Sequence, residues 1–139
     1  MKNLTRIPFF AFALITIVLS SCAKYEEGGI SLESKKSRLV NHWRTEKITA
    51  DGIDITALNL ITELEISDNN SIAVHSALLG IPTVDNGAWA FNPGKTAVLV
   101  TNNQGSLTSY EIVMLQKDEF KVRNTNADGV VYLHHYVTY

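Results

Sequence analysis

The chain has 139 residues, 45% of them hydrophobic, and carries 12 Lys and Arg against 14 Asp and Glu. This length suits one globular domain with one apolar core. A mildly acidic chain without a basic stripe argues against nucleic-acid binding. The single cysteine, Cys22, excludes a disulfide framework within the chain, so the apolar core alone must hold the fold.

The first 21 residues have the features of a signal peptide. Lys2 and Arg6 precede an almost unbroken apolar run from Ile7 to Leu19. A membrane-spanning helix needs roughly 20 apolar residues, so this run is too short for a permanent anchor. Its length suits the hydrophobic segment of a secretory signal.

The end of this run resembles the lipobox of bacterial lipoproteins. In Leu19-Ser20-Ser21-Cys22, a branched apolar residue and two small residues precede a cysteine. The resemblance implies that residues 1–21 are cleaved off and that the Cys22 thiol carries diacylglycerol, with acyl chains such as palmitate. Each buried CH₂ contributes about 0.8 kcal/mol, so two or three chains anchor a protein stably. The alternative is an ordinary secretory signal followed by a chance cysteine.

Residues 22–30 are predicted to form a lipidated, flexible tether. Lys24-Tyr25-Glu26-Glu27 resembles the signal that sends lipoproteins of Bacteroidota to the cell surface, although Tyr25 separates the lysine from the acidic pair. The alternative is a plain solvated tether. We therefore expect an outer-membrane lipoprotein, on the periplasmic face or at the cell surface.

Residues 31–139 are predicted to form one domain. A short helix within residues 31–40 precedes segments rich in β-branched and aromatic residues, separated by turn signals about every ten residues. Leu64 and Ile66 alternate with Glu63 and Glu65, as in a strand with one buried face. Such a pattern predicts an all-β fold, an eight-stranded antiparallel up-and-down barrel that has no exposed edges. The expected strands are 42–50, 61–68, 71–78, 87–92, 95–102, 106–115, 119–125 and 130–138.

The connections predict two unlike ends for this barrel. Those at 51–60, 79–86, 103–105 and 126–129 fall at one end, and most are longer than those at the other. Among the short connections, Asn92-Pro93-Gly94-Lys95 fits a type II turn. The chain enters the first strand at the end with short connections. The lipid should therefore lie at that end, with the longer loops facing away from the membrane.

The domain resembles the lipocalin-like lipoproteins of Bacteroidota. Leu39-Val40-Asn41-His42-Trp43 stands in the place of the lipocalin Gly-x-Trp signature, with Asn41 instead of the glycine. Gly87–Phe91 and Tyr110–Leu115 resemble later segments of these domains. The resemblance implies a lipocalin-like barrel in which Trp43 plugs the floor, and we expect Trp89 to be a second structural residue.

The sequence offers no candidate catalytic or metal site. The four histidines are His42, His75, His134 and His135, and the last two are adjacent on a strand, so their side chains point to opposite faces. Glu63 and Glu65 are expected to face water. We therefore predict a monomeric, non-enzymatic protein without cofactor or metal.

The candidate binding residues are apolar. Leu79, Ile81 and Val84 fall in a predicted loop, and Leu58 and Leu60 lie in the first long connection on the same rim. These side chains either cap the barrel or form a hydrophobic rim. The second interpretation predicts binding of a small hydrophobic ligand at the open end. The alternative function is a protein-interaction module of the cell envelope.

Overall fold

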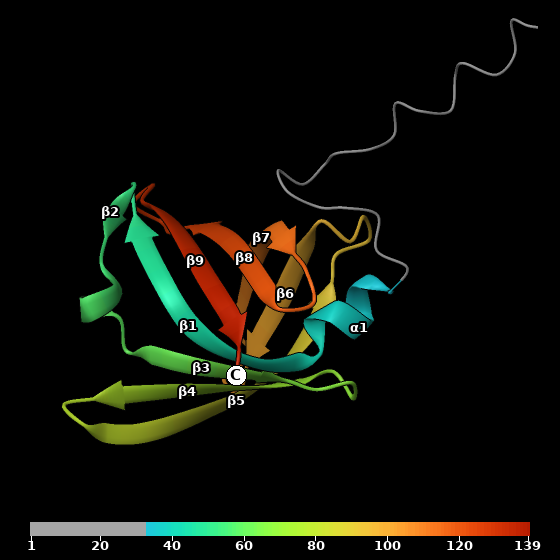
Figure 1. Cartoon of the computed structure of the whole chain (residues 1–139), viewed down its shortest axis with the longest axis horizontal. Helices are drawn as coiled ribbons and strands as arrows, with labels where there is room; N and C mark the ends of the chain where they lie inside the picture. The colour runs from blue at the N-terminus through green and yellow to red at the C-terminus, as the bar shows by residue number, and fades with distance from the viewer. Residues whose placement is uncertain (1–32) are drawn as a thin grey trace, which may run out of the picture.

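Eight strands pair in sequence order and close into an antiparallel barrel, because the last strand, β9, also pairs with β1 (Figure 1). The computed structural model describes residues 33–139. The elements are α1 (Lys35–Leu39), β1 (Asn41–Ala50), β2 (Ile53–Asp54), η1 (Thr56–Leu58), β3 (Ile61–Ile66), β4 (Ser71–Leu78), β5 (Ile81–Phe91), β6 (Ala97–Asn102), β7 (Leu107–Leu115), β8 (Glu119–Thr125) and β9 (Val131–Thr138). The predicted eight-stranded barrel with a preceding short helix is confirmed.

The predicted alternation holds where it was clearest. Leu64 and Ile66 are buried while Glu65 is exposed, and on β8 Phe120 and Val122 are buried. The inward residues of all eight barrel strands meet in one core. Burial of apolar area contributes about 25 cal/mol per Å², so this core is the main source of stability in a chain without disulfides.

The fourth connection differs from the predicted type II turn. The amide of Lys95 donates to the Asn92 carbonyl over 2.9 Å, but the positive φ, 52°, belongs to Lys95 and not to Gly94. The Asn92 side-chain oxygen accepts from the amides of Thr96 and Ala97, which stabilises this conformation. The geometry is a type I turn followed by a left-handed residue, a common hairpin connection. Related turns, each with a left-handed glycine at the fourth position, occur at Asn102–Gly105 and Asn126–Gly129.

The predicted loop 79–86 is wrong, since β5 begins at Ile81. Leu79 and Gly80 have φ values of 51° and 80° and form a two-residue turn that pairs Leu78 with Ile81. This is the shortest hairpin type, so the prediction of a longer connection here is also wrong. Only the first connection, which holds β2 and η1, is long.

The first half of β5 pairs with β4 alone, because β6 reaches only Gly87–Phe91. Pro82 fits there, since by the alternation of the ladder its missing N–H points away from β4. The pairing with β6 starts at Gly87, where the strands approach closely. A Cβ at this position would lie 2.4 Å from the Thr101 carbonyl oxygen.

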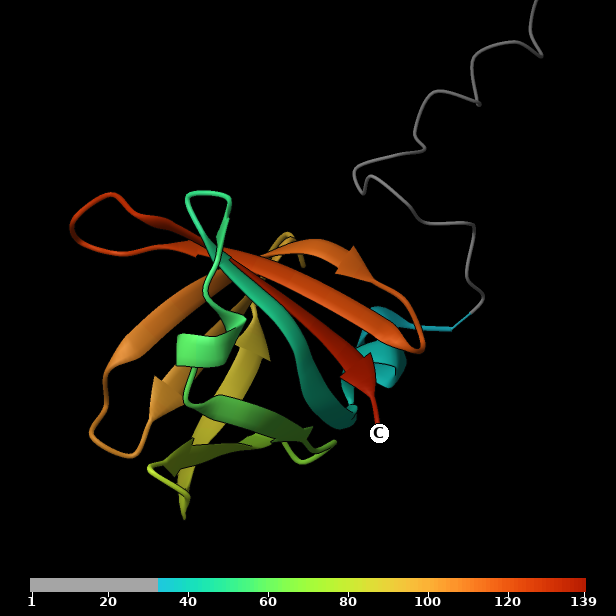
Figure 2. The same ribbon diagram turned by 60° about the vertical axis from the view of Figure 1, so that its left-hand side comes forward.

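Helix α1 lies at one end of the barrel, and the β1–β2 and β8–β9 hairpins lie at the other (Figure 2). We call these the closed end and the open end. The Ser34 side chain accepts from the Ser37 amide and begins the helix. At the end of the helix, the Trp43 indole donates to the Leu39 carbonyl over 2.9 Å, and Arg38 donates to the Leu115 carbonyl over 2.7 Å. The helix is thereby bound to both β1 and β7.

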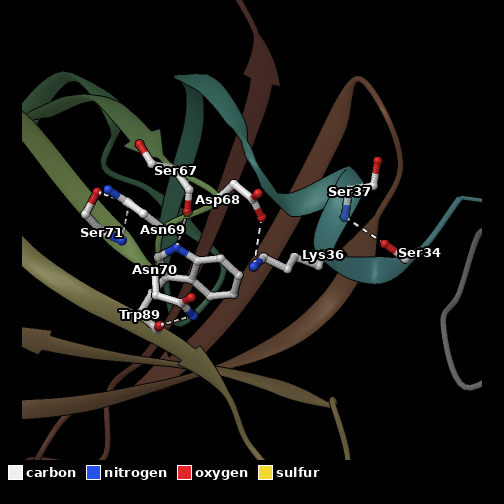
Figure 3. A network of polar contacts seen from close by, with 9 residues as sticks. All are labelled: Ser34, Lys36, Ser37, Ser67, Asp68, Asn69, Asn70, Ser71 and Trp89. Atoms are coloured by element: carbon white, nitrogen blue, oxygen red, sulfur yellow. Dashed lines mark hydrogen bonds and ion pairs between the residues drawn. The ribbon is translucent and has the colours of Figure 1, made fainter.

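Polar contacts join α1 and β5 to the turn between β3 and β4 (Figure 3). Lys36 pairs with Asp68 at 2.8 Å, and the Trp89 indole donates to the Ser67 carbonyl over 3.0 Å. The Asn70 amide group in turn donates to the Trp89 carbonyl over 3.2 Å. Trp89 is therefore buried with its indole N–H satisfied.

The predicted signal peptide 1–21 and the whole predicted tether 22–30, with the lipidated Cys22, lie outside the described residues. Glu33, the first described residue, precedes α1 at the closed end. Within residues 33–139, no helix is both long enough and apolar enough to cross a bilayer.

Candidate ligand-binding site

A cavity of about 60 Å³ lies inside the barrel, between the closed end and the open end. Its floor includes Phe120, whose ring packs on Trp43 with the centroids 5.5 Å apart. The lining side chains are Ile61, Leu64, Ile66, Ile72, Val74, Val98, Val100, Tyr110, Phe120, Val122, His134 and Tyr136. They contain no Lys, Arg, Asp or Glu, so the cavity presents an uncharged surface.

Strand alternation places the three polar lining residues. On β9, His134 pairs with Val122 and Tyr136 with Phe120, so both face inward with their buried partners. On β7, Tyr110 pairs with Val98, another inward residue. These three aromatic side chains form one cluster, because the ring of His134 lies 6.0 Å from that of Tyr110 and 6.1 Å from that of Tyr136.

The hydrogen bonds of His134 define its tautomer. Its Nε2 lies 3.1 Å from the Asn124 side-chain oxygen, and its Nδ1 lies 3.4 Å from the Tyr136 hydroxyl. With the Asn124 oxygen as acceptor, Nε2 carries the proton and Nδ1 accepts from Tyr136. Among the described residues, the Tyr110 hydroxyl makes no hydrogen bond.

Burial keeps this cluster neutral. It lowers the pKa of His134 and raises the pKa of Tyr110. Burial, together with the nearby Tyr110, raises the pKa of Tyr136 far above its usual value. At neutral pH the cavity therefore offers neutral hydroxyl and imidazole groups against an apolar wall.

The size of the cavity limits what it can hold. A cavity of roughly 150 Å³ accommodates benzene in an engineered protein core. Drug-sized ligands occupy pockets of roughly 300–1,000 Å³. A ligand of this barrel is therefore small, or its tail extends from the cavity toward the open end.

The five predicted binding residues do not line this cavity. Leu58, Leu60, Leu79, Ile81 and Val84 are all exposed, and Leu79 is 95% exposed at the tip of the β4–β5 hairpin. They lie at the open end, on the first connection and on the β4–β5 hairpin, and we call this set the rim. Their role in binding stays a prediction.

Sequence reasoning missed the interior residues Tyr110, His134 and Tyr136. Part of the signal lies in the alternation of residues 132–136, where every second side chain (Tyr132, His134 and Tyr136) is aromatic or His. Taken alone in the sequence, His134 suggests only a metal ligand. Its neighbour His135 points outward and lies 2.7 Å from Glu119, so the two histidines face opposite sides.

The other histidines pair with carboxylates on the outer surface. His42 lies 3.0 Å from Glu63, and His75 lies 3.2 Å from Glu65. Hydrogen bonds from His42 and then Tyr139 lower the pKa of Glu63.

No three His, Cys, Asp or Glu side chains gather as a metal site within residues 33–139. A shallow hollow between α1 and the β3–β4 turn has Lys36 on its wall, already paired with Asp68.

No family model and no curated protein matches the chain. Solved structures do match. Bovine odorant-binding protein in complex with its natural ligand has a TM-score of 0.50 and 15% identity, over 82% of this chain and 77% of that one. An odorant-binding protein named OBP1 has a TM-score of 0.52 and 13% identity, over 78% and 77%. The barrel is lipocalin-like. The resemblance seen in the sequence is confirmed for the fold, and an origin among lipoproteins of Bacteroidota stays a prediction.

Proposed function

We propose that this lipocalin-like barrel binds a small hydrophobic molecule in its interior cavity. The observation that carries the proposal is an apolar cavity closed at one end by Trp43 and α1. Apolar surface in such a cavity favours an apolar ligand because both are removed from water. Bovine odorant-binding protein, which shares the fold, has been solved in complex with undecanal, with a TM-score of 0.50 and 15% identity.

A titration with hexane tests this proposal, because a linear chain can extend from the small cavity toward the open end. The chain carrying Cys22→Ser, which has no acceptor for lipid, would be followed by methyl NMR. We expect saturable shifts at Val74, Val100 and Val122, which line the cavity. Shifts that stay linear with concentration, or that appear only at Leu79 on the exposed rim, would contradict it.

We further propose that lipid on Cys22 anchors the protein in the outer membrane. The proposal is supported by Leu19-Ser20-Ser21-Cys22 and by the entry of the chain at the closed end, which would point the open end away from the bilayer. Cys22→Ser should move the protein from the membrane to the soluble fraction. The control Ser20→Ala keeps a small residue and should stay membrane-bound. Persistence of the Cys22→Ser protein in membranes would disprove the anchor.

A second candidate function is a protein-interaction module. It is favoured by the apolar side chains exposed at the open end, above all Leu79 and Ile81 on the β4–β5 hairpin. A photocrosslinker at Thr83 on this hairpin should capture one envelope protein that a crosslinker at Lys95, at the closed end, does not. The same products from both positions would count against this function.

A further inference from the structure

Tyr110 carries the one cavity-lining polar group without a partner among the described residues. Tyr136 and His134 bond to each other, and His134 also bonds to Asn124. The Tyr110 hydroxyl has no such bond, although its ring is fixed edge-on to His134. This hydroxyl is accessible to water and is not fully buried. A hydrocarbon ligand would shield it from water without replacing the lost hydrogen bond, so the hydroxyl favours a ligand that supplies a partner.

The donors and acceptors around Tyr110 define that partner. With Nδ1 of His134 as its acceptor, the Tyr136 hydroxyl can accept further bonds but has no second proton to donate. Tyr110 can both donate and accept. A ligand hydroxyl matches this arrangement, because it also donates and accepts, whereas a hydrocarbon leaves Tyr110 unpaired.

The surroundings also determine the charge of the ligand. No Lys or Arg lines the cavity, and the imidazole of His134 is held neutral by burial. A carboxylate would therefore lose its hydration without gaining an opposite charge, and an ammonium group would find no carboxylate. The cavity disfavours both ions.

We propose that the cavity selects small, uncharged alcohols, whose hydroxyl group pairs with the hydroxyl of Tyr110 while the hydrocarbon part contacts the Val and Ile side chains. This inference rests on the proposed function, since it names the ligand class of the same cavity. It makes Tyr110 a specificity-determining residue, because its bond to the ligand distinguishes an alcohol from a hydrocarbon.

The test compares pentan-1-ol, hexane and pentanoate in the full chain carrying Cys22→Ser at pH 7.5. The first two have equal numbers of non-hydrogen atoms. We expect Tyr110→Phe to weaken pentan-1-ol binding about five-fold, the worth of one neutral hydrogen bond, and to leave hexane binding unchanged. Pentanoate should bind at least about ten-fold more weakly than pentan-1-ol.

The matched control is Tyr132→Phe, which makes the same chemical change on β9. Tyr132 lies 6.3 Å from the His134 ring but does not line the cavity, so both affinities should stay as in the parent chain. The inference is overturned if Tyr110→Phe changes both affinities equally or neither of them, or if pentanoate binds as well as pentan-1-ol. If neither hexane nor pentan-1-ol binds, both this inference and the proposed function fail.

Discussion

The Trp43 indole N–H and the Leu39 carbonyl form a hydrogen bond of 2.9 Å between two side-by-side residues that are both 0% exposed. Leu39 ends α1, and Trp43 lies three residues into β1. The bond satisfies a helix carbonyl and an indole donor at once, in a place that water does not reach. It thereby joins the helix to the barrel floor on which Phe120 and the cavity rest.

Trp43→Phe should lower the free energy of unfolding by about 2–4 kcal/mol, because it leaves a small void and a buried carbonyl without a donor. Urea denaturation followed by circular dichroism measures the change. Leu107→Ala removes an exposed leucine on β7 and should change stability by less than about 0.5 kcal/mol. If both substitutions lowered the free energy of unfolding equally, the contact between Trp43 and Leu39 would contribute no particular stability.

Gly87→Ala should destabilise the barrel by about 1–3 kcal/mol, because the added Cβ lies 2.4 Å from the Thr101 carbonyl and the strands must separate. Gly94→Ala is the matched control, since its Cβ would meet only the Thr96 side chain, at 3.8 Å and beyond. The midpoints of thermal unfolding compare the two. A Gly87→Ala protein as stable as the Gly94→Ala protein would show that β5 and β6 separate at no cost.

Stability should fall on acidification in a way that depends on His134. Burial lowers its pKa in the folded state, so the unfolded chain binds the proton more readily. The stabilisation is complete above about pH 6.5, the ordinary His value, and is lost as the pH falls through the folded-state pKa. The slope for one proton is at most about 1.4 kcal/mol per pH unit. His134→Gln should flatten the urea-denaturation profile between pH 7 and pH 5, whereas a profile unchanged from that of the parent chain would refute this role of His134.

Much of the barrel follows from local sequence. Alternation such as Leu64 and Ile66 against Glu65 identifies a half-buried strand, and the turn residues set the hairpins. The start of β5 could not be predicted this way. Leu79 adopts a left-handed conformation that leucine rarely adopts, and Pro82 occurs in a strand only because β6 does not reach it.

The cavity was harder to predict than the strands. The alternation of residues along a strand tells which side chains face inward. The space left between Tyr110, Val100 and His134, however, depends on how eight strands tilt and pack together. The exposed Leu58, Leu60 and Leu79 could be recognised in the sequence because they lie in predicted connections between strands. The interior polar cluster could be inferred only in part, from the alternation along β9, because Tyr110 on β7 meets His134 and Tyr136 only in the closed barrel.

The most direct test of the central claim is to fill the cavity from one strand and measure hexane binding. Val100 and Leu99 are neighbours on β6, but only Val100 lines the cavity. Val100→Phe should abolish saturable binding while the NMR spectrum stays dispersed, which shows that the protein is folded. The control Leu99→Phe adds the same ring on the outer face of β6 and should leave saturable binding unchanged. Unchanged hexane binding by a folded Val100→Phe protein would contradict the interior site.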